Sequence, residues 1–469
     1  MKILLIEPAK APVTLGGDDV FMFEPLALEY VAAGVAKNHD VRILDLRLEK
    51  NLQQVLEEFS PDVVGITAYT VHVNTVIGLF DRIKMWNPEV LTVVGGHHAT
   101  VVPEDFVSPS IDVIVRGEGV FPFREIVLRH EARRGFDNIP GVMTQGADLR
   151  GEGFPMTVDL DGMPFPERVL TAKYREHYYS EWMKPLASIR TSKGCPYRCN
   201  FCALWKVAGG KYFRRTPESV VEELAGIEEE FVFFADDESL IDVVRMEALA
   251  RLIKAAGIRK RYFLYGRSDT IAKHPRLLEL WRDVGLARIF VGLEFFRDED
   301  LKYIRKNSTT QDNAKAMRVV QDLGIEVYAS LIIRPEFTKE DFEALIEYCH
   351  TLGLSYASFA VLTPLPGTDL YNEVESRMIT HNYDYFDFIH TLLPTELPLR
   401  DFYREYARLF RRAVPPSKAI PFLLQYPWKE IPPTLAKSYR WQQRLRSVHL
   451  DYGQAGLPGS EKTLRQTLC

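Results

Sequence analysis

Short apolar runs alternate with amphipathic stretches in two series along this chain of 469 residues. The first series comprises Ile3–Ile6, Val41–Leu44, Val63–Ile66, Leu91–Val94 and Ile111–Val115. Amphipathic segments such as Leu26–Ala36 and Val73–Met85 lie between these runs. Strands that alternate with helices favour a parallel sheet covered on both faces. We therefore predict an α/β protein that begins with a Rossmann-like domain over residues 1–139.

The second series has a longer period and follows a stretch without clear periodicity, residues 140–185, which we predict to be a linker. Its candidate strands are Ala187–Thr191, Phe231–Ala235, Tyr262–Tyr265, Ile289–Leu293, Glu326–Ile332 and Tyr356–Leu362. Six strand–helix units are fewer than the eight that close a (β/α)8 barrel. Residues 376–469 are rich in aromatic side chains, and the amphipathic segment Leu399–Val414 predicts a small, mainly helical C-terminal region.

Three of the five cysteines, Cys195, Cys199 and Cys202, lie in a C-x3-C-x2-C run just after the first strand of the second series. A closed structural zinc site uses four ligands. Three thiolates instead suit a [4Fe-4S] cluster with one iron open to a further ligand. A zinc site completed by a distant residue such as His177, or three unrelated buried thiols, are the alternatives that the spacing leaves open.

The cysteine run, with the aromatic Phe201 directly before its third cysteine, resembles the cluster motif of the radical S-adenosylmethionine (SAM) enzymes. The resemblance implies a partial (β/α)6 barrel over residues 186–375. It also implies SAM on the open iron and its cleavage to methionine and a 5′-deoxyadenosyl radical.

Polar residues at the ends of the later strands then become candidates for holding SAM, because barrel chemistry lies at the carboxyl ends of strands. The resemblance implies Asp236, Asp237 and Glu238 for the methionyl ammonium, Arg267 for the carboxylate, Glu294 for the ribose hydroxyls and Arg334 as a second cation. Acids at strand ends also cap the next helix, so we expect Asp242 at the surface.

The first series contains no G-x-G-x-x-G sequence. Its Val-Val-Gly-Gly-x-His-Ala and Arg-Gly-Glu-Gly runs instead resemble the cobalamin-binding domain that precedes the barrel in one class of radical SAM enzymes. The residues expected to bind cobalamin are Tyr69, Thr70, Gly95, Gly96, His97, Gly117 and Glu118.

The Asp-x-His-x-x-Gly motif of many cobalamin domains is absent from the first loop, which reads Glu7-Pro8-Ala9-Lys10. The resemblance therefore implies a base-off corrin without a histidine from that motif on cobalt. A lone histidine such as His72 or His97 is more often a hydrogen-bonded loop residue than a metal ligand.

The resemblance covers roughly residues 1–375 and implies cobalamin-dependent methylation of an unactivated carbon. The extension Cys202–Tyr212 is similar to that of the hopanoid C-3 methylases, which implies an apolar small-molecule substrate methylated on ring A. A radical SAM cyclase or oxidase of the anaerobic magnesium-protoporphyrin ester cyclase type is the alternative. A cobalamin- and iron–sulfur-dependent sensor is a third hypothesis, for which no DNA-binding motif is evident.

The composition of the chain limits which binding partners and which cellular compartment we expect. A net charge of −6 without a basic recognition segment argues against nucleic acid. An odd number of cysteines, three of them clustered, fits the reducing cytoplasm. No apolar run approaches the roughly 18 residues of a membrane span. We expect a cytoplasmic enzyme that takes electrons from a flavodoxin or ferredoxin, and peripheral contact with the inner membrane surface is compatible with the sequence.

Overall fold

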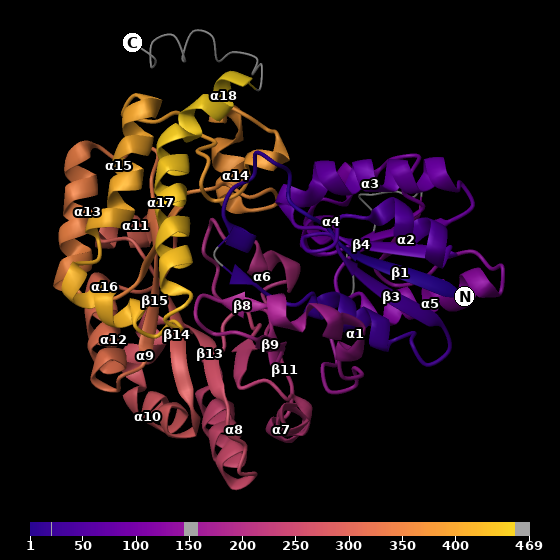
Figure 1. Ribbon diagram of the computed structural model, residues 1–469, viewed down its shortest axis with the longest axis horizontal. Helices are drawn as coiled ribbons and strands as arrows, with labels where there is room; N and C mark the ends of the chain where they lie inside the picture. Colours follow the sequence, from indigo (N-terminus) through magenta and orange to yellow (C-terminus); the bar gives the residue numbers. More distant parts are fainter. Residues whose placement is uncertain (20, 145–157, 455–469) are drawn as a thin grey trace. The chain divides into compact units, whose positions relative to one another are not determined.

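The computed structural model describes residues 1–19, 21–144 and 158–454, shown in Figure 1. The chain divides into two units. The first contains Met1–Arg198, Cys202–Glu229 and Leu365–Asn372. The second contains Cys199–Phe201, Glu230–Pro364 and the chain from Glu373 onward.

The first unit is built on a six-stranded sheet in the order β3-β1-β4-β5-β6-β7. Its parallel strands are β1 (Lys2–Glu7), β3 (Asp40–Asp45), β4 (Val63–Thr67), β5 (Leu91–Gly95) and β6 (Val113–Val115). The helices that alternate with them are α1 (Leu26–Ala33), α2 (Leu52–Phe59), α3 (Val73–Trp86), α4 (His97–Val101) and α5 (Val120–Glu131). The predicted Rossmann-like arrangement is thus confirmed, and helix α1 is shorter than the predicted segment.

An antiparallel edge strand was not predicted. Strand β7 (Val142–Thr144) lies in the stretch predicted as linker and pairs antiparallel with β6. Three residues are too few to show a periodic pattern, so the sequence gives no sign of this strand. Its pairing satisfies backbone groups that the edge of β6 would otherwise expose.

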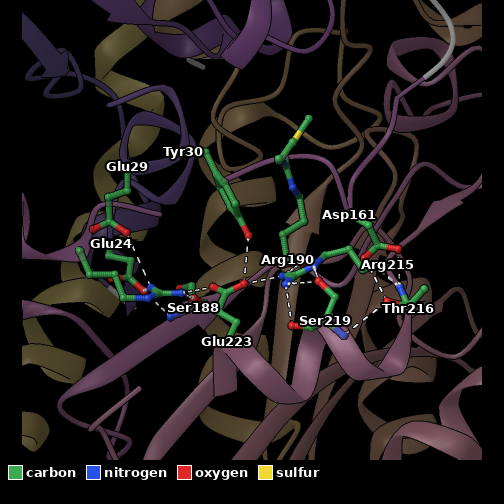
Figure 2. Close-up of polar contacts among 12 residues, drawn as sticks. Glu24, Glu29, Tyr30, Asp161, Ser188, Arg190, Arg215, Thr216, Ser219 and Glu223 are labelled. Atoms are coloured by element: carbon green, nitrogen blue, oxygen red, sulfur yellow. Dashed lines mark hydrogen bonds and ion pairs between the residues drawn. The ribbon is translucent and has the colours of Figure 1, made fainter. Parts of the chain in front are cut away.

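The predicted linker also contains η4 (Arg168–His177), which we call the strap. A network of buried charges holds the strap within the first unit (Figure 2). The Arg168 guanidinium donates to Glu24 Oε1 at 2.8 Å and to Glu223 Oε1 at 2.6 Å. It also donates to the Ser188 carbonyl at 2.7 Å. The Glu24 and Glu223 carboxylates are almost fully buried. Arg168 thus links the segment before α1, its own segment η4 and the first strand–helix unit of the second series.

Glu29 lies beside the same arginine, with 3.7 Å between Arg168 Nη1 and Glu29 Oε2. Burial, followed by the charge of Glu24, raises the pKa of Glu29 to about 8, against the opposing effects of Arg168 and Thr171. The Thr171 hydroxyl donates to the Glu29 carboxyl. Within this network, Glu29 is therefore largely protonated at neutral pH.

All six strands predicted in the second series are present. Strand β9 (Leu186–Ile189) belongs to the first unit. In the second unit, β12 (Phe231–Phe234), β13 (Arg261–Arg267), β14 (Leu286–Glu294), β15 (Glu326–Ile333) and β16 (Ala357–Val361) pair in parallel in chain order. The helices between strands include α7 (Pro217–Gly226), α8 (Val243–Ala255), α10 (Pro275–Val284), α12 (Thr310–Asp322) and α13 (Lys339–Thr351).

Local sequence explains where these helices begin. Capping boxes start α12 and α13, formed by Thr309 with Asp312 and by Thr338 with Asp341. The side chain of Asp242 accepts the Arg245 backbone N–H at 3.0 Å and so caps α8. Asp242 is therefore a helix cap, and it is half-buried where the sequence led us to expect it at the surface.

The C-terminal region is mainly helical, as predicted. It contains α15 (Leu399–Arg412), α16 (Pro416–Leu423), α17 (Ile431–Ser447) and α18 (Asp451–Gln454). Helices α15 and α17 pack against each other (Figure 1). Buried His390 lies between two carboxylates, at 2.8 Å from Asp387 and 2.9 Å from Asp451. The contact with Asp451 anchors α18. Over the part of the chain that the structure describes, no helix combines the length and apolar character needed to cross a bilayer.

Candidate cofactor and active site

A two-stranded ladder closes the cysteine loop at its base. Strand β10 (Ser192–Lys193) pairs antiparallel with β11 (Phe213–Arg214). Gly194, directly before Cys195, has φ +89°, and a Cβ there would collide with the Lys211 carbonyl oxygen. Only glycine fits where the chain passes this close to Lys211, and the cysteine loop therefore begins directly after strand β10.

The third cysteine is followed by the short helix α6 (Leu204–Val207), which packs against α4 in the first unit. The Lys206 ammonium lies 4.2 Å from the centre of the Trp205 ring and 2.8 Å from Asp369 Oδ1. Arg198 lies over the same ring at 5.8 Å. These contacts fix the segment after Cys202.

Cys199 is buried, whereas Cys195 and Cys202 are half-buried. Burial raises the pKa of the Cys199 thiol, and the nearby cations Lys306 and Arg267 oppose this effect. The loop is anchored beside Cys199 because the Asn200 backbone N–H donates to the Ile304 carbonyl at 3.1 Å. Nearby cations favour the thiolate form of a cysteine, although burial outweighs them at Cys199 in the chain alone.

Glu238 lies in the loop after β12 and is buried. Its Oε1 accepts the Arg267 backbone N–H at 3.1 Å. Its Oε2 is buried without a hydrogen-bond partner among the described residues. Burial raises the pKa of Glu238 to about 7, although hydrogen bonds from the Arg267 and Leu240 backbone lower it. A buried carboxyl oxygen without a partner is costly, so this atom is suited to a cationic ligand.

The other residues expected to bind SAM already have partners in the chain. Arg267 Nε donates to Asp269 Oδ1 at 2.9 Å, and its guanidinium also donates to the Lys306 carbonyl. Glu294, at φ +60°, accepts from Lys306 Nζ at 2.6 Å. Arg267 and Glu294 thus lie near Cys199. Which group of SAM each of them contacts stays a prediction.

Arg334 lies apart from that group in its contacts, since it pairs with Asp300 at 2.6 Å and Glu336 at 3.3 Å. Asp236 is buried and Asp237 half-buried after β12, while Phe201 is half-buried. Over the described ranges, no three His, Cys, Asp or Glu side chains converge in the geometry of a metal site. The ligand role of the three cysteines therefore remains a prediction.

The candidate cobalamin residues follow the carboxyl ends of β4, β5 and β6 in the first sheet, the edge where ligands bind in such folds. Gly96 has φ +104°, and a Cβ there would lie 2.7 Å from Ala68 N and Thr67 Oγ1. Tyr69 is half exposed and packs edge-on against His97, with ring centres 4.9 Å apart. Burial lowers the pKa of His97 to about 4, with a further contribution from Lys193 and opposition from Glu118. His97 is therefore a neutral imidazole beside an exposed aromatic ring.

Glu118 is held by cations near the cysteine loop. Its Oε2 lies 3.1 Å from Arg190 Nη1 and 3.0 Å from Lys193 Nζ. Burial alone would raise the pKa of Glu118, but Arg190 and Lys193 lower it to about 2. The carboxylate thus connects the loop after β6 to the strand that precedes Cys195.

Backbone and hydroxyl contacts order the remaining loop residues. The Gly117 N–H donates to Thr100 Oγ1 at 3.0 Å, and Gly95 is the last residue of β5. Thr70 Oγ1 lies 3.1 Å from Nδ1 of buried His98. Burial, with the charge of Arg47, lowers the pKa of His72 to about 4. Thr70 supports the loop through His98, a contact that sequence reasoning did not identify.

Sequence reasoning also missed Lys306, Arg190 and Lys193, which are the counterions of Glu294 and Glu118. Lys193 carried a usable signal, because it lies two residues before Cys195. Lys306 carried none, since it is distant in sequence from every predicted site residue except Glu294.

Comparison with known families agrees with this arrangement. Residues 14–127 match the model of the B12 binding domain, and residues 189–349 match that of the radical SAM superfamily. The two domains together define a cobalamin-binding radical SAM enzyme.

The hopanoid C-3 methylase of Methylococcus capsulatus is 34% identical over 419 residues, which cover 87% of this chain and 79% of that protein. The anaerobic magnesium-protoporphyrin IX monomethyl ester cyclase of Rubrivivax gelatinosus is 28% identical, with 73% of this chain and 63% of that protein covered. This chain belongs to the cobalamin-dependent radical SAM methyltransferases.

Among solved structures, the radical SAM methyltransferase TsrM of Kitasatospora setae, with cobalamin and a [4Fe-4S] cluster bound, superimposes with a TM-score of 0.64. The match covers 80% of this chain and 78% of TsrM at 20% identity. That likeness confirms the fold, with a cobalamin-binding domain before a radical SAM domain.

The residues present fit the cofactors of this class. The carboxyl oxygen of Glu238 without a partner fits an ammonium group, and the cations around Cys199 fit an anionic iron–sulfur cluster. The positive-φ backbone at Gly96 packs closely against Thr67 and Ala68, and this contact fixes the loops at the edge of the sheet where the corrin is expected.

We expect Gly96→Ala to reduce cobalamin binding at least about 10-fold, because strain at positive φ and contact with Ala68 must displace the loop. Gly78→Ala is the matched control, since Gly78 lies within α3 and its added Cβ would meet nothing within 4 Å. Equilibrium dialysis with hydroxocobalamin measures the difference. Equal binding by both variants would show that the Gly96 loop does not approach the corrin.

Proposed function

We propose that this enzyme methylates an unactivated carbon of an apolar lipid, namely C-3 in ring A of a hopanoid. The observation that carries the substrate is the 34% identity with a hopanoid C-3 methylase over 87% of this chain. The cyclase relative is less similar and covers less of the chain. Methylation is therefore the better-supported reaction.

When bound, the cluster would supply the electron that cleaves one SAM to methionine and a hydrogen-abstracting radical, and cobalamin would supply the substrate carbon with a methyl group taken from a second SAM. Cys195, Cys199 and Cys202 would hold the cluster. Lys306 and Arg267 support the negative charge near Cys199. Tyr69, His97, Gly96 and the Gly117 loop would hold the corrin at the carboxyl edge of the first sheet.

Glu238 would bind the SAM ammonium through its Oε2, with Arg267 and Glu294 positioned around Cys199 for the carboxylate and ribose. The Arg267 backbone N–H and the burial of the carboxyl group orient the binding oxygen. Because the pKa of Glu238 is about 7, its ionised fraction increases across neutral pH. Ammonium binding favours the ionised form and would lower that pKa.

We expect Glu238→Gln to raise the KM for SAM about 10- to 100-fold, the cost of losing one charge-assisted hydrogen bond. In the unmodified enzyme, SAM affinity should increase up to about 10-fold between pH 6 and 8, and the Gln variant should lose this dependence. Asp242→Asn is the control, because Asp242 caps a helix. A pH dependence that survives in Glu238→Gln would exclude this role.

The reaction is tested with anaerobic enzyme reconstituted with iron, sulfide and cobalamin, then given SAM, dithionite and a hopanoid that lacks the C-3 methyl group. We expect a product heavier by one methyl group in place of one hydrogen, together with 5′-deoxyadenosine and S-adenosylhomocysteine. Formation of 5′-deoxyadenosine without S-adenosylhomocysteine, together with a product of altered oxygen content, would favour the cyclase reaction. Methylation of other lipids but not of hopanoids would overturn the substrate assignment alone.

A flavodoxin or ferredoxin in the cytoplasm would supply the electrons that dithionite supplies in the assay. The clustered thiols support this placement, since free thiols persist in a reducing compartment. Replacing dithionite with reduced flavodoxin in the same assay tests whether flavodoxin can act as the electron donor.

A further inference from the structure

Helices α16 and α17 expose an unusual number of large apolar side chains. Phe422 anchors α16 because it is buried, with its ring 5.0 Å from Tyr356 and 5.9 Å from Tyr426. Its neighbours Ile420 and Leu424 are 55% and 71% exposed. The inner side of α16 is thus packed, and a second apolar side is left in solvent.

The exposed residues continue along the chain at spacings of four and seven residues. Trp428, in the turn after α16, is 76% exposed, and Leu435 and Tyr439 on α17 are 50% and 64% exposed. Leu435 and Tyr439 lie one turn apart and so share a side of α17. We define Ile420, Leu424, Trp428, Leu435 and Tyr439 as the C-terminal apolar row.

Cations accompany this row. Residues 415–447 contain one acidic residue, Glu430, and six basic residues, Lys418, Lys429, Lys437, Arg440, Arg444 and Arg446. Lys418, Lys429, Lys437 and Arg440 are exposed, and the Lys429 ammonium lies 5.8 Å from the centre of the Trp428 ring. This segment is strongly basic in a chain whose net charge is −6.

Exposed aliphatic and aromatic residues interleaved with cations are the chemistry that recognises an anionic lipid surface. Tryptophan and tyrosine favour the level of the headgroups, where the apolar ring is buried and the polar edge stays wet. A second copy of the chain is a poorer occupant, since a two-fold contact would bring two basic segments together.

We propose that the C-terminal apolar row docks the enzyme on the surface of a bilayer that contains anionic phospholipids. The row enters the headgroup region, and Lys418, Lys429, Lys437 and Arg440 contact the lipid phosphates. This inference depends on the C-terminal surface alone and does not require the proposed methylation.

The test is co-sedimentation of the full-length protein, without SAM, with vesicles of phosphatidylcholine alone or mixed equally with phosphatidylglycerol. We expect binding at least about 10-fold stronger to the mixed vesicles, with weakening at high salt. The triple variant Leu424→Ser, Trp428→Ser, Tyr439→Ser should lose most of this binding. The double variant Lys429→Glu, Lys437→Glu should lose the preference for phosphatidylglycerol.

The matched control is Met85→Ser with Val244→Ser, because both side chains are exposed, at 85% and 79%, and lie outside α16 and α17. It should bind vesicles like the unmodified protein, and circular dichroism should show that all variants are folded. Vesicle binding unchanged in the triple variant, or absent in the unmodified protein, would overturn the proposal. So would a doubled mass in light scattering that the triple variant abolishes, because a second copy would then cover the row.

Discussion

Replacing Cys195, Cys199 and Cys202 together by Ala is expected to reduce bound iron from about four atoms per chain to near zero. Formation of 5′-deoxyadenosine from SAM should fall to the level of a protein-free control. The reason is that a cubane cluster needs a thiolate on each iron that SAM does not occupy. Iron analysis and liquid chromatography of the SAM products measure both effects on anaerobically reconstituted protein.

Cys349→Ala is the matched control for the triple variant. Cys349 is a fully buried thiol on α13, and burial raises its pKa to about 12, so it is a packing residue. We expect this control to keep its iron and its SAM cleavage, at a stability cost of about 1 kcal/mol. Cobalamin retained by the triple variant would show that it is folded. Four irons in the triple variant would exclude these cysteines as the cluster ligands.

Replacing Arg168 by Met is expected to destabilise the protein by about 3 kcal/mol, because removing the shared cation leaves its buried carboxylates only partly compensated. Arg168 is the shared donor to Glu24, Glu223 and the Ser188 carbonyl. Arg175 and Arg215 remain as counterions of the two carboxylates, so the loss should stop short of complete unfolding. Urea unfolding followed by circular dichroism measures the change in the free energy of unfolding.

Arg251→Met is the control for Arg168. Arg251 pairs with Glu247 at 3.0 Å on the surface of α8, with its side chain 62% exposed. A surface pair of this kind contributes about 0.5 kcal/mol or less. Similar losses in the two variants would mean that the buried network contributes no more than an exposed ion pair.

The sequence was informative where structure is local. Apolar runs bounded by polar residues predicted six strands of the second series but not the two-residue strands β10 and β11. The Thr-Asp pairs that start α12 and α13 follow rules of a few residues. Strand β7 was missed because three residues carry no period, and its place depends on the free edge of β6.

The candidate site shows the same limit. The residue types and the strand-end positions of Glu238 and Glu294 could be read from the chain. The pairing of Glu294 with Lys306 and of Glu118 with Arg190 could not, because both depend on how distant segments fold together. The sequence also gave no indication that Glu238 has an oxygen without a partner, since that follows from burial.

The Arg168 network has a consequence for chimeric enzymes. The first unit runs through the strap and onward to Glu229, well past the start of the radical SAM match at residue 189. A crossover between two relatives near residue 186 would take Glu24 and Arg168 from one parent and Glu223 from the other. A crossover after Glu229 would inherit all three charges from one parent. Exchange of corrin-binding modules within this family should therefore follow the boundary of the ion network.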